Sequence, residues 1–187
     1  MADLSNTAYV ILGFLAARPR TGYEIKQAVD NSTRFFWATS YGQIYPELRK
    51  LAKAGLVEGE AKPTGGRRRT VYRLTDTGRD ELRRWLEKPP EVFELRDESI
   101  LKLFFASEAT PERAIEIVEA RKRFHEEKIA ELREIEAYAK RRSESDPYPY
   151  LVLRSGIAFS ESVIEACERA QAELEKAEAK RNRRRAA

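Results

Sequence analysis

The stretch that most constrains the fold of this chain is residues 40–75, whose pattern predicts one helix followed by one β-hairpin. Ile44, Leu48 and Leu51 fall at i, i+4 and i+7, so they share one side of the helix. Gly55 follows the last periodic residue, where a glycine commonly ends a helix. The sequence therefore predicts a helix with a single apolar face, followed at once by a turn into a strand.

The start and the outer face of this helix are also specified. Ser40 and Gln43 have the spacing of a capping box, which satisfies backbone N–H groups of the first turn. Pro46 lacks the amide hydrogen that a helix interior uses, so we expect an irregular first turn. The face opposite the apolar one is cationic, with little bulk at its N-terminal end. Its members are Gly42, Pro46, Arg49 and Lys53, flanked by Gln43, Tyr45 and Lys50.

Two short strands are expected next, at residues 57–61 and 70–74. They are joined through Pro63, Thr64, Gly65 and Gly66, with Arg67, Arg68 and Arg69 at the tip. A helix with a basic outer face before a hairpin with an arginine tip is the layout of a winged helix-turn-helix. In that layout the helix enters the major groove of DNA, and the hairpin arginines reach phosphates or the minor groove. The alternative is that the arginines form only a solvated turn.

The residues before this stretch supply the other helices of such a domain. Residues 5–15 have the spacing of a first helix, and Thr21 and Glu24 form a second capping box. The short helix that this box opens is expected to cross the DNA backbone. Tyr23 and Lys26 on it are candidate phosphate contacts. For Tyr23, a place in the core is an equal alternative.

Three groups of residues in this half of the chain occur together in one known family. They are Gly22-Tyr23-Glu24-Ile25, then Gly42-Gln43-Ile44-Tyr45-Pro46-Glu47-Leu48 with Leu51 and Gly55-Leu56-Val57, and last Tyr72-Arg73-Leu74-Thr75 with Gly78. With them the chain resembles the PadR-like transcriptional regulators, and its second half looks like the helical dimerisation region of the larger members. The resemblance implies a DNA-binding regulator, more often a repressor than an activator, that a small molecule or a partner releases from DNA.

The charge is distributed unevenly along the chain. Residues 1–88 carry a net charge of +6, residues 89–179 a net charge of −7, and residues 180–187 add five cations. A basic first half is typical of a DNA-binding module, whereas an acidic second half is expected to stay away from phosphate. Since Pro89-Pro90 breaks the helical pattern, we predict a winged helix-turn-helix domain at 1–88. A helical dimerisation domain with a basic C-terminal tail is predicted at 89–187.

The second half is expected to be helical and to need a partner. Residues 97–107 have the pattern of a compact apolar helix that should be buried. Thr110 and Pro111 open a helix that runs to about residue 143, and a second long helix with two adjacent apolar stripes starts near residue 150. One antiparallel neighbour cannot cover both stripes, so we predict a C2 homodimer. Such a dimer would set two recognition helices about 34–36 Å apart and require a near-palindromic operator.

Catalytic chemistry is not expected. The chain has one cysteine, Cys167, and one histidine, His125, which excludes an intrachain disulfide and a His/Cys zinc cluster. His125 is expected on the surface or at an interface, and Cys167 as a small packed residue. We therefore predict no enzyme activity, no cofactor and no metal site. The longest apolar run, residues 8–17, is too short to span a bilayer, so a cytoplasmic protein without membrane contact is expected.

Aromatic residues near the helix-turn-helix have two interpretations. Phe35, Phe36 and Trp37 stand together between two helices, and Trp85 lies on the expected buried side of the helix that Thr75 opens. Packing is the expected role of these aromatic residues. The family resemblance adds the alternative that Trp37 or Trp85 lines a pocket in which a small aromatic effector stacks.

Sequence-specific binding to double-stranded DNA is thus the predicted function, and nonspecific architectural binding is the alternative. Base edges would be read by Gln43, Tyr45 and Arg49, whereas Tyr41 would contact a phosphate or a thymine methyl. The predicted DNA-binding residues are Tyr23, Lys26, Tyr41, Gln43, Tyr45, Arg49, Lys50, Lys53, Arg67, Arg68 and Arg69.

Overall fold

The chain forms two compact units, residues 1–92 and residues 93–187. The computed structural model describes residues 4–64, 67–91 and 96–186, apart from the side chains of 62–64, 67, 68, 182 and 184–186. Gly65 and Gly66, predicted to turn the hairpin, lie outside the described residues.

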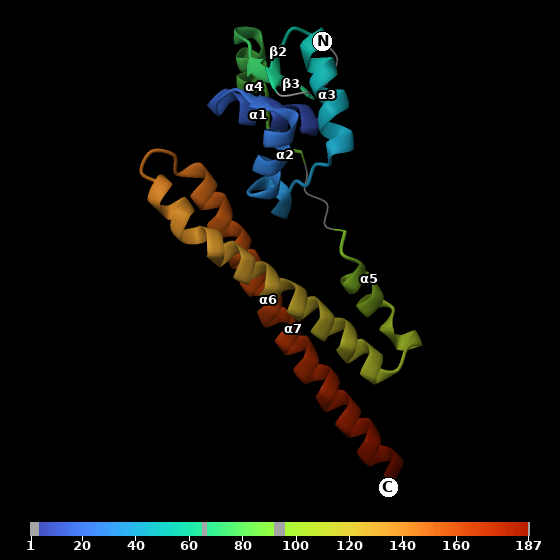
Figure 1. Cartoon of the computed structure of the whole chain (residues 1–187). Helices are drawn as coiled ribbons and strands as arrows, with labels where there is room; N and C mark the ends of the chain where they lie inside the picture. Colours follow the sequence, from blue (N-terminus) through green and yellow to red (C-terminus); the bar gives the residue numbers. More distant parts are fainter. Residues whose placement is uncertain (1–3, 65–66, 92–95, 187) are drawn as a thin grey trace. The chain divides into compact units, whose positions relative to one another are not determined.

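The first unit combines helices with a small antiparallel sheet (Figure 1). Its helices are α1 (Asn6–Ala17), α2 (Gly22–Asp30), the 3-10 turn η1 (Thr33–Phe35), α3 (Tyr41–Lys53) and α4 (Asp76–Glu87). Its strands are β1 (Arg20–Thr21), β2 (Val57–Thr64) and β3 (Arg67–Leu74). Strand β3 lies between β1 and β2 and pairs with both, with Thr21 opposite Val71 and Val57 opposite Leu74. Helices α1, α2 and α3 followed by the β2–β3 hairpin give the element order of a winged helix-turn-helix.

Side chains at the helix starts explain where these helices begin. Thr21 and Glu24 form the predicted capping box, in which Thr21 N–H donates to Glu24 Oε2 at 2.7 Å and Glu24 N–H donates to Thr21 Oγ1 at 3.2 Å. At the start of α3, Ser40 N–H donates to Gln43 Oε1 at 2.9 Å. Each bond satisfies an N–H group that has no partner within the helix. Helix α3 continues through Pro46, contrary to the irregular turn expected there.

The apolar face of α3 closes the core of the first unit. Ile44, Leu48 and Leu51 are fully buried, as their spacing predicts. They belong to one cluster with Leu12 of α1 and Ile25 of α2, which are also fully buried. Burying a side chain of this size contributes roughly 1.5–3 kcal/mol. The core therefore fixes α3 with its opposite face toward solvent.

The end of α3, the start of β2 and the start of α4 meet at one junction. Gly55 ends α3 at φ 70°, in the left-handed region that favours glycine. Thr75 Oγ1 donates to the Gly55 carbonyl at 2.8 Å and accepts from Gly78 N–H at 3.0 Å. Thr75 N–H donates to the Leu56 carbonyl at 3.2 Å. These bonds attach the hairpin and α4 to the end of α3.

The second unit is built from two long helices and a short one. Its elements are α5 (Glu98–Phe104), the 3-10 turn η2 (Ala106–Glu108), α6 (Pro111–Arg142) and α7 (Tyr148–Ala186). Helices α6 and α7 run side by side in opposite directions, and α7 continues beyond the start of α6 (Figure 1). The predicted cap of α6 is present, because Thr110 Oγ1 accepts from Arg113 N–H at 3.3 Å. Buried apolar residues of the pair include Val118, Ile129, Leu132, Leu153, Ile157 and Val163.

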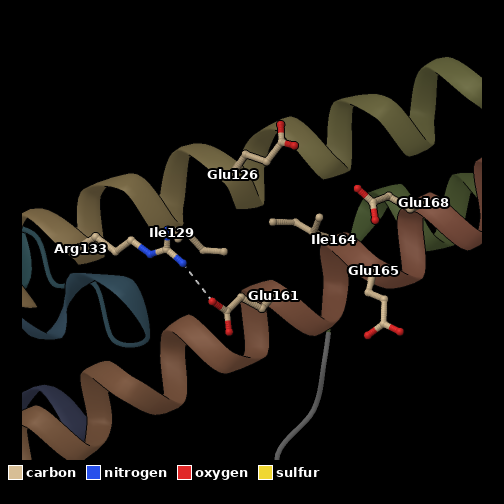
Figure 2. A pocket seen from close by; sticks show the side chains of 7 residues that line it. All are labelled: Glu126, Ile129, Arg133, Glu161, Ile164, Glu165 and Glu168. Carbon is tan, nitrogen blue, oxygen red and sulfur yellow. Dashed lines mark hydrogen bonds and ion pairs between the residues drawn. The ribbon is translucent and has the colours of Figure 1, made fainter.

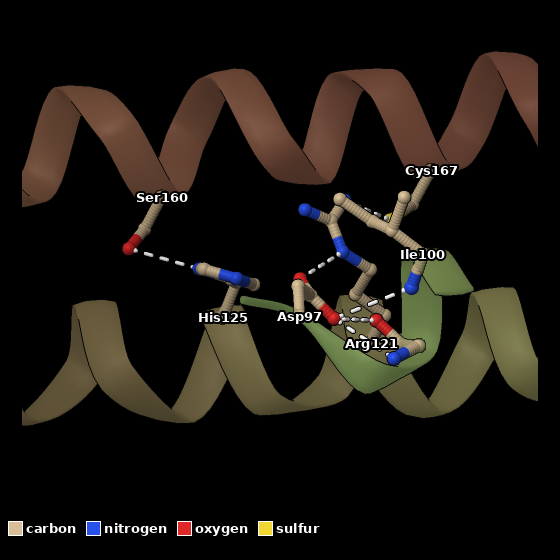
Figure 3. Close-up of polar contacts among 7 residues, drawn as sticks. Asp97, Ile100, Arg121, His125, Ser160 and Cys167 are labelled. Carbon is tan, nitrogen blue, oxygen red and sulfur yellow. Dashed lines mark hydrogen bonds and ion pairs between the residues drawn. The ribbon is translucent and has the colours of Figure 1, made fainter. Parts of the chain in front are cut away.

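Polar contacts run through the interior of the second unit (Figure 3). Arg121 of α6 donates from Nε to Asp97 Oδ2 at 3.0 Å and from Nη1 to the buried Cys167 Sγ at 3.6 Å. His125 is 5% exposed, and its Nδ1 lies 3.1 Å from Ser160 Oγ of α7. The surface or interface position expected for His125 is therefore wrong. Residue 125 falls on the face of α6 that meets α7, and a serine supplies the polar partner that a buried imidazole needs.

Several apolar side chains of the second unit face solvent. On α5, Leu101 and Phe104 are 58% and 79% exposed, so the expectation that this helix is buried is wrong for the single chain. Leu103 of the same helix packs against the α6–α7 core. On α7, Val152 and Phe159 of the second apolar stripe are also exposed. The single chain thus leaves an apolar surface uncovered.

Candidate nucleic-acid interface

The outer face of α3 carries exposed cations. Arg49, Lys50 and Lys53 are all exposed, and the exposed Gly42 leaves little bulk near the start of the helix. Lys50 Nζ lies 3.2 Å from Glu47 Oε2, so part of its charge is offset. This is the amphipathic arrangement that the sequence predicts, with the apolar side in the core and the cations in solvent.

Three tyrosines form a ladder on the surface where α2 meets α3. The rings of Tyr23 and Tyr41 are stacked with centroids 6.4 Å apart, and those of Tyr41 and Tyr45 are stacked at 6.2 Å. Tyr23 is 55% exposed, so it is not a core residue. The Tyr45 ring lies against Gly22, where an added Cβ would be 2.7 Å from it. A glycine at the start of α2 therefore gives this tyrosine ladder the space it occupies.

Two other predicted contacts are engaged within the protein. The Lys26 ammonium pairs with Asp30 and lies 5.6 Å from the centre of the Tyr41 ring. Gln43 Oε1 accepts hydrogen bonds from both the N–H and the hydroxyl of Ser40. Lys26 thus joins the tyrosine ladder, and the side-chain oxygen of Gln43 serves the cap of α3.

The hairpin arginines begin β3 instead of standing in a turn. The backbones of Arg67 and Arg68 pair with those of Thr64 and Pro63, so both strands are longer than predicted. A proline is tolerated in β2 because this strand is at the edge of the sheet and needs no hydrogen bond on its outer side. The side chains of Arg67 and Arg68 lie outside the described residues.

Arg69 is held by the start of α2. Its Nη2 lies 3.0 Å from Glu24 Oε1, and Arg18 Nη1 lies 4.0 Å from the same oxygen. The other oxygen, Oε2, accepts from the N–H and the hydroxyl of Thr21 at 2.7 and 2.8 Å. The backbone hydrogen bond from Thr21 lowers the pKa of Glu24 most; burial raises it, and further bonds from Thr21 and Arg69 bring it to about 2. Glu24 is therefore a fixed anion at neutral pH.

The two tryptophans have different surroundings. Trp37 is 42% exposed and follows the exposed Phe36. Trp85 of α4 is half-buried, packs against the core of the first unit and stacks on Tyr9 with ring centroids 4.5 Å apart. Packing accounts for Trp85. Trp37 instead presents an aromatic ring to solvent.

Comparison with known proteins matches both units. Residues 11–84 match the transcriptional regulator PadR-like family, and residues 95–175 match the virulence activator alpha C-terminal family. Over 144 residues the chain is 29% identical to the negative transcriptional regulator PadR of Bacillus subtilis (strain 168), which covers 76% of this chain and 78% of that protein. The chain belongs to the PadR-like family.

Solved structures of the PadR-like family share the fold. Bacillus subtilis PadR in complex with operator DNA is similar with a TM-score of 0.80 and 29% identity, covering 89% of this chain and 98% of that one. Bacillus subtilis PadR in complex with p-coumaric acid gives a TM-score of 0.76 and 28% identity, with 90% and 98% coverage. The predicted fold class, mainly helical with a winged helix-turn-helix and long C-terminal helices, is confirmed. As a PadR-like protein, the chain is a DNA-binding transcriptional regulator.

The second unit of this PadR-like protein has an open groove of about 410 Å³ between α6 and α7 (Figure 2). Ile129 and Ile164 line it together with Arg133 and with the carboxylates of Glu126, Glu161, Glu165 and Glu168. Arg133 pairs with Glu161 at 3.2 Å. Because acidic side chains outnumber basic ones here, the groove is unsuited to phosphate.

Two further properties concern the described part of the chain. No described helix is both long and apolar enough to cross a membrane. Within the same residues, no group of three or more His, Cys, Asp or Glu side chains is arranged to hold a metal ion.

The capping role of Glu24 follows from its spacing to Thr21 in the sequence, whereas its contact with Arg69 does not. Capping depends on local spacing, whereas this contact joins α2 to a strand far along the chain. The pairing register of β1 with β3 explains why Arg69 reaches Glu24. Thr21 pairs with Val71, and Arg69 lies two residues from Val71 on the same side of β3, beside the start of α2.

Proposed function

We propose that this protein is a dimeric, sequence-specific transcriptional repressor that binds a near-palindromic operator and is released by a small molecule. One observation carries the proposal. Helix α3 buries Ile44, Leu48 and Leu51 completely while Arg49 and Lys53 remain exposed on the other side. A helix held by its apolar face with cations outward suits the major groove of DNA.

Phosphate contacts would supply affinity and its dependence on salt. The cations proposed for this role are Arg49, Lys50, Lys53, Arg67 and Arg68, with Tyr23 and Lys26 at the backbone crossed by α2. Arg69 differs from these residues because its guanidinium pairs with Glu24.

Base reading is proposed for the first half of α3. Tyr45 and Arg49 are exposed on its outer face, and Tyr41 is exposed one turn earlier. Gln43 is exposed as well, but its oxygen is bound by Ser40, so its amide group would be the part that contacts a base. Because tyrosine rings offer apolar surface, thymine methyl groups are suitable partners for Tyr41 and Tyr45.

A second copy of the chain is proposed to cover the apolar surface of the second unit. Leu101 and Phe104 of α5 and Val152 and Phe159 of α7 are exposed in the single chain, and burying them against a partner would remove this apolar surface from water. A two-fold dimer would present two copies of α3 to successive major grooves, about 34–36 Å apart. This spacing is the reason for a near-palindromic operator.

A small aromatic molecule is proposed as the effector. Bacillus subtilis PadR has been solved with p-coumaric acid, an aromatic acid. In this chain, Trp37 offers an open ring for stacking, whereas one face of Trp85 is covered by Tyr9. Of the two tryptophans, Trp37 is therefore the better candidate.

The test is fluorescence anisotropy with labelled DNA from immediately upstream of the protein's own gene, against a scrambled duplex, at several salt concentrations. A preference of about 10³-fold or more with a steep salt dependence supports the proposal. Equal affinity for both duplexes would favour architectural binding. Absence of binding at low salt would refute DNA binding by this surface, and light scattering that gives a monomeric mass would refute the dimer.

A further inference from the structure

The contact between Glu24 and Arg69 joins two parts of the first unit that DNA binding is proposed to use together. Glu24 belongs to α2, and Arg69 belongs to β3 of the hairpin. Of the three hairpin arginines, Arg69 is the one whose side chain is described, and its Nη2 lies 3.0 Å from Glu24 Oε1. The orientation of a hairpin cation is thus set from outside the hairpin.

The carboxylate is the fixed partner of this pair. Two hydrogen bonds from Thr21 hold Glu24 Oε2, and the Glu24 side chain is 26% exposed. The Arg69 side chain is 51% exposed and belongs to a long, flexible residue type, so it is the partner that adjusts. To contact a phosphate in full, the guanidinium would have to leave an anion that cannot follow it. Glu24 therefore competes with DNA for Arg69.

We propose that Glu24 is a positioning residue that holds Arg69 against α2 and keeps it from acting as a phosphate contact. The inference rests on the proposed DNA binding of this unit. Its consequence concerns the affinity for DNA of any sequence, because phosphate contacts strengthen binding to every sequence alike. By withholding one cation, Glu24 lowers the affinity for every duplex by a similar factor, so base contacts supply a larger share of the total binding free energy.

Glu24→Gln separates this role from helix capping. The chain itself shows that glutamine can cap, since Gln43 Oε1 accepts from Ser40 N–H at 2.9 Å at the start of α3. A glutamine at position 24 keeps an acceptor for Thr21 and removes the charge that holds Arg69. The matched control is Glu60→Gln, which removes the same charge from the hairpin. The ion pair between Glu60 and Arg73 is long, at 4.0 Å, and both side chains are more than half exposed. Removing the Glu60 charge therefore changes the freedom of Arg73 very little.

The experiment measures anisotropy with a scrambled duplex at several salt concentrations, with folding checked by circular dichroism. For Glu24→Gln we expect the slope of log affinity against log salt to steepen by about 0.9, and affinity at 0.15 M salt to rise about five-fold. Arg69→Ala should keep the wild-type slope, and so should Glu60→Gln. The double variant Glu24→Gln/Arg69→Ala should return to that slope.

Each contrary result has a definite meaning. A slope that falls by about 0.9 in Arg69→Ala would show that Arg69 contacts phosphate beside Glu24, and would overturn the inference. This variant leaves the cap intact, so it decides the matter even where Glu24→Gln does not fold. A folded Glu24→Gln with an unchanged slope, or a gain that persists in the double variant, would overturn it as well. Wild-type protein that binds no DNA at low salt would instead refute the proposed function, and the inference with it.

Discussion

Replacing Gly78 by alanine is expected to lower the free energy of unfolding of the first unit by about 1–3 kcal/mol. An added Cβ would lie 2.0 Å from the carbonyl oxygen of Leu56 and 2.8 Å from Leu74 Cδ1. The leucine side chain can rotate, but the carbonyl belongs to the backbone at the start of β2. The start of α4 or this peptide group must therefore move by on the order of 1 Å to reach an ordinary contact distance.

The magnitude follows from two costs and one smaller gain, since Gly78 lies in α4 and alanine is a better helix residue than glycine by roughly 1 kcal/mol. Inserting a methyl group into a closely packed site costs roughly 1–3 kcal/mol. Moving the Leu56 carbonyl also weakens its hydrogen bond with Thr75 N–H, now 3.2 Å long, and such a bond is worth roughly 0.5–1.5 kcal/mol. The strain falls on the junction that connects α3, the hairpin and α4, so local relaxation is limited.

Gly13→Ala is the matched control, because Gly13 lies within α1 and an added Cβ there meets no atom within 4 Å. Alanine is a better helix residue than glycine by roughly 1 kcal/mol, so this variant should be more stable than the wild type. Urea unfolding followed by circular dichroism measures both changes. A Gly78→Ala variant that unfolds at the wild-type urea concentration or above would refute the account of the junction.

Three other predictions concern DNA binding and pH. Arg49→Ala should cost about 1–3 kcal/mol in operator affinity and relax specificity, and an unchanged ratio of specific to nonspecific affinity would remove Arg49 from base reading. Arg67→Ala combined with Arg68→Ala should flatten the salt slope by about 1.8 in anisotropy titrations, and an unchanged slope would exclude both from phosphate contact. Burial raises the pKa of Asp97, but hydrogen bonds to its carboxylate, one of them from Arg121, have the larger combined effect and lower the pKa to about 2. The ionised Asp97 therefore stabilises the fold by on the order of 2 kcal/mol above about pH 4, and this stabilisation is lost as the pH falls toward 2. Urea unfolding at several pH values should show this loss in the wild type and lack it in Asp97→Asn.

Local patterns in the sequence predicted much of this fold. The spacing of Ile44, Leu48 and Leu51 predicted which side of α3 is buried, because residues on one face of a helix recur every three or four positions in the sequence. The capping boxes that begin at Thr21 and Ser40 predicted the helix starts for a similar reason, since the two side chains of each box are only three residues apart.

Features that depend on distant parts of the chain were predicted less well. The strand lengths were underestimated because Pro63 resembles a turn residue, and only its place on an edge strand makes it acceptable in β2. His125 was expected at the surface or at an interface because its partner, Ser160, lies on another helix. The apolar residues of α5 show the reverse case, since their pattern calls for burial that a single chain does not supply.

The ion pairs of the first unit bear on how strongly it can bind DNA of any sequence. Three acidic residues near the proposed interface pair with candidate contacts: Asp30 with Lys26, Glu47 with Lys50, and Glu24 with Arg69. Among the described residues no ion pair is seen for Arg49 or Lys53.

Seven cations were proposed from sequence, so a salt slope of about −6.3 per subunit would follow if all of them contacted phosphates. If the three paired cations stay with their carboxylates, the slope should be nearer −3.6 per subunit. A measured slope near the larger value would mean that DNA displaces these carboxylates. A value near the smaller one would mean that the unit holds back part of its charge, so that base contacts supply a larger share of its total binding free energy.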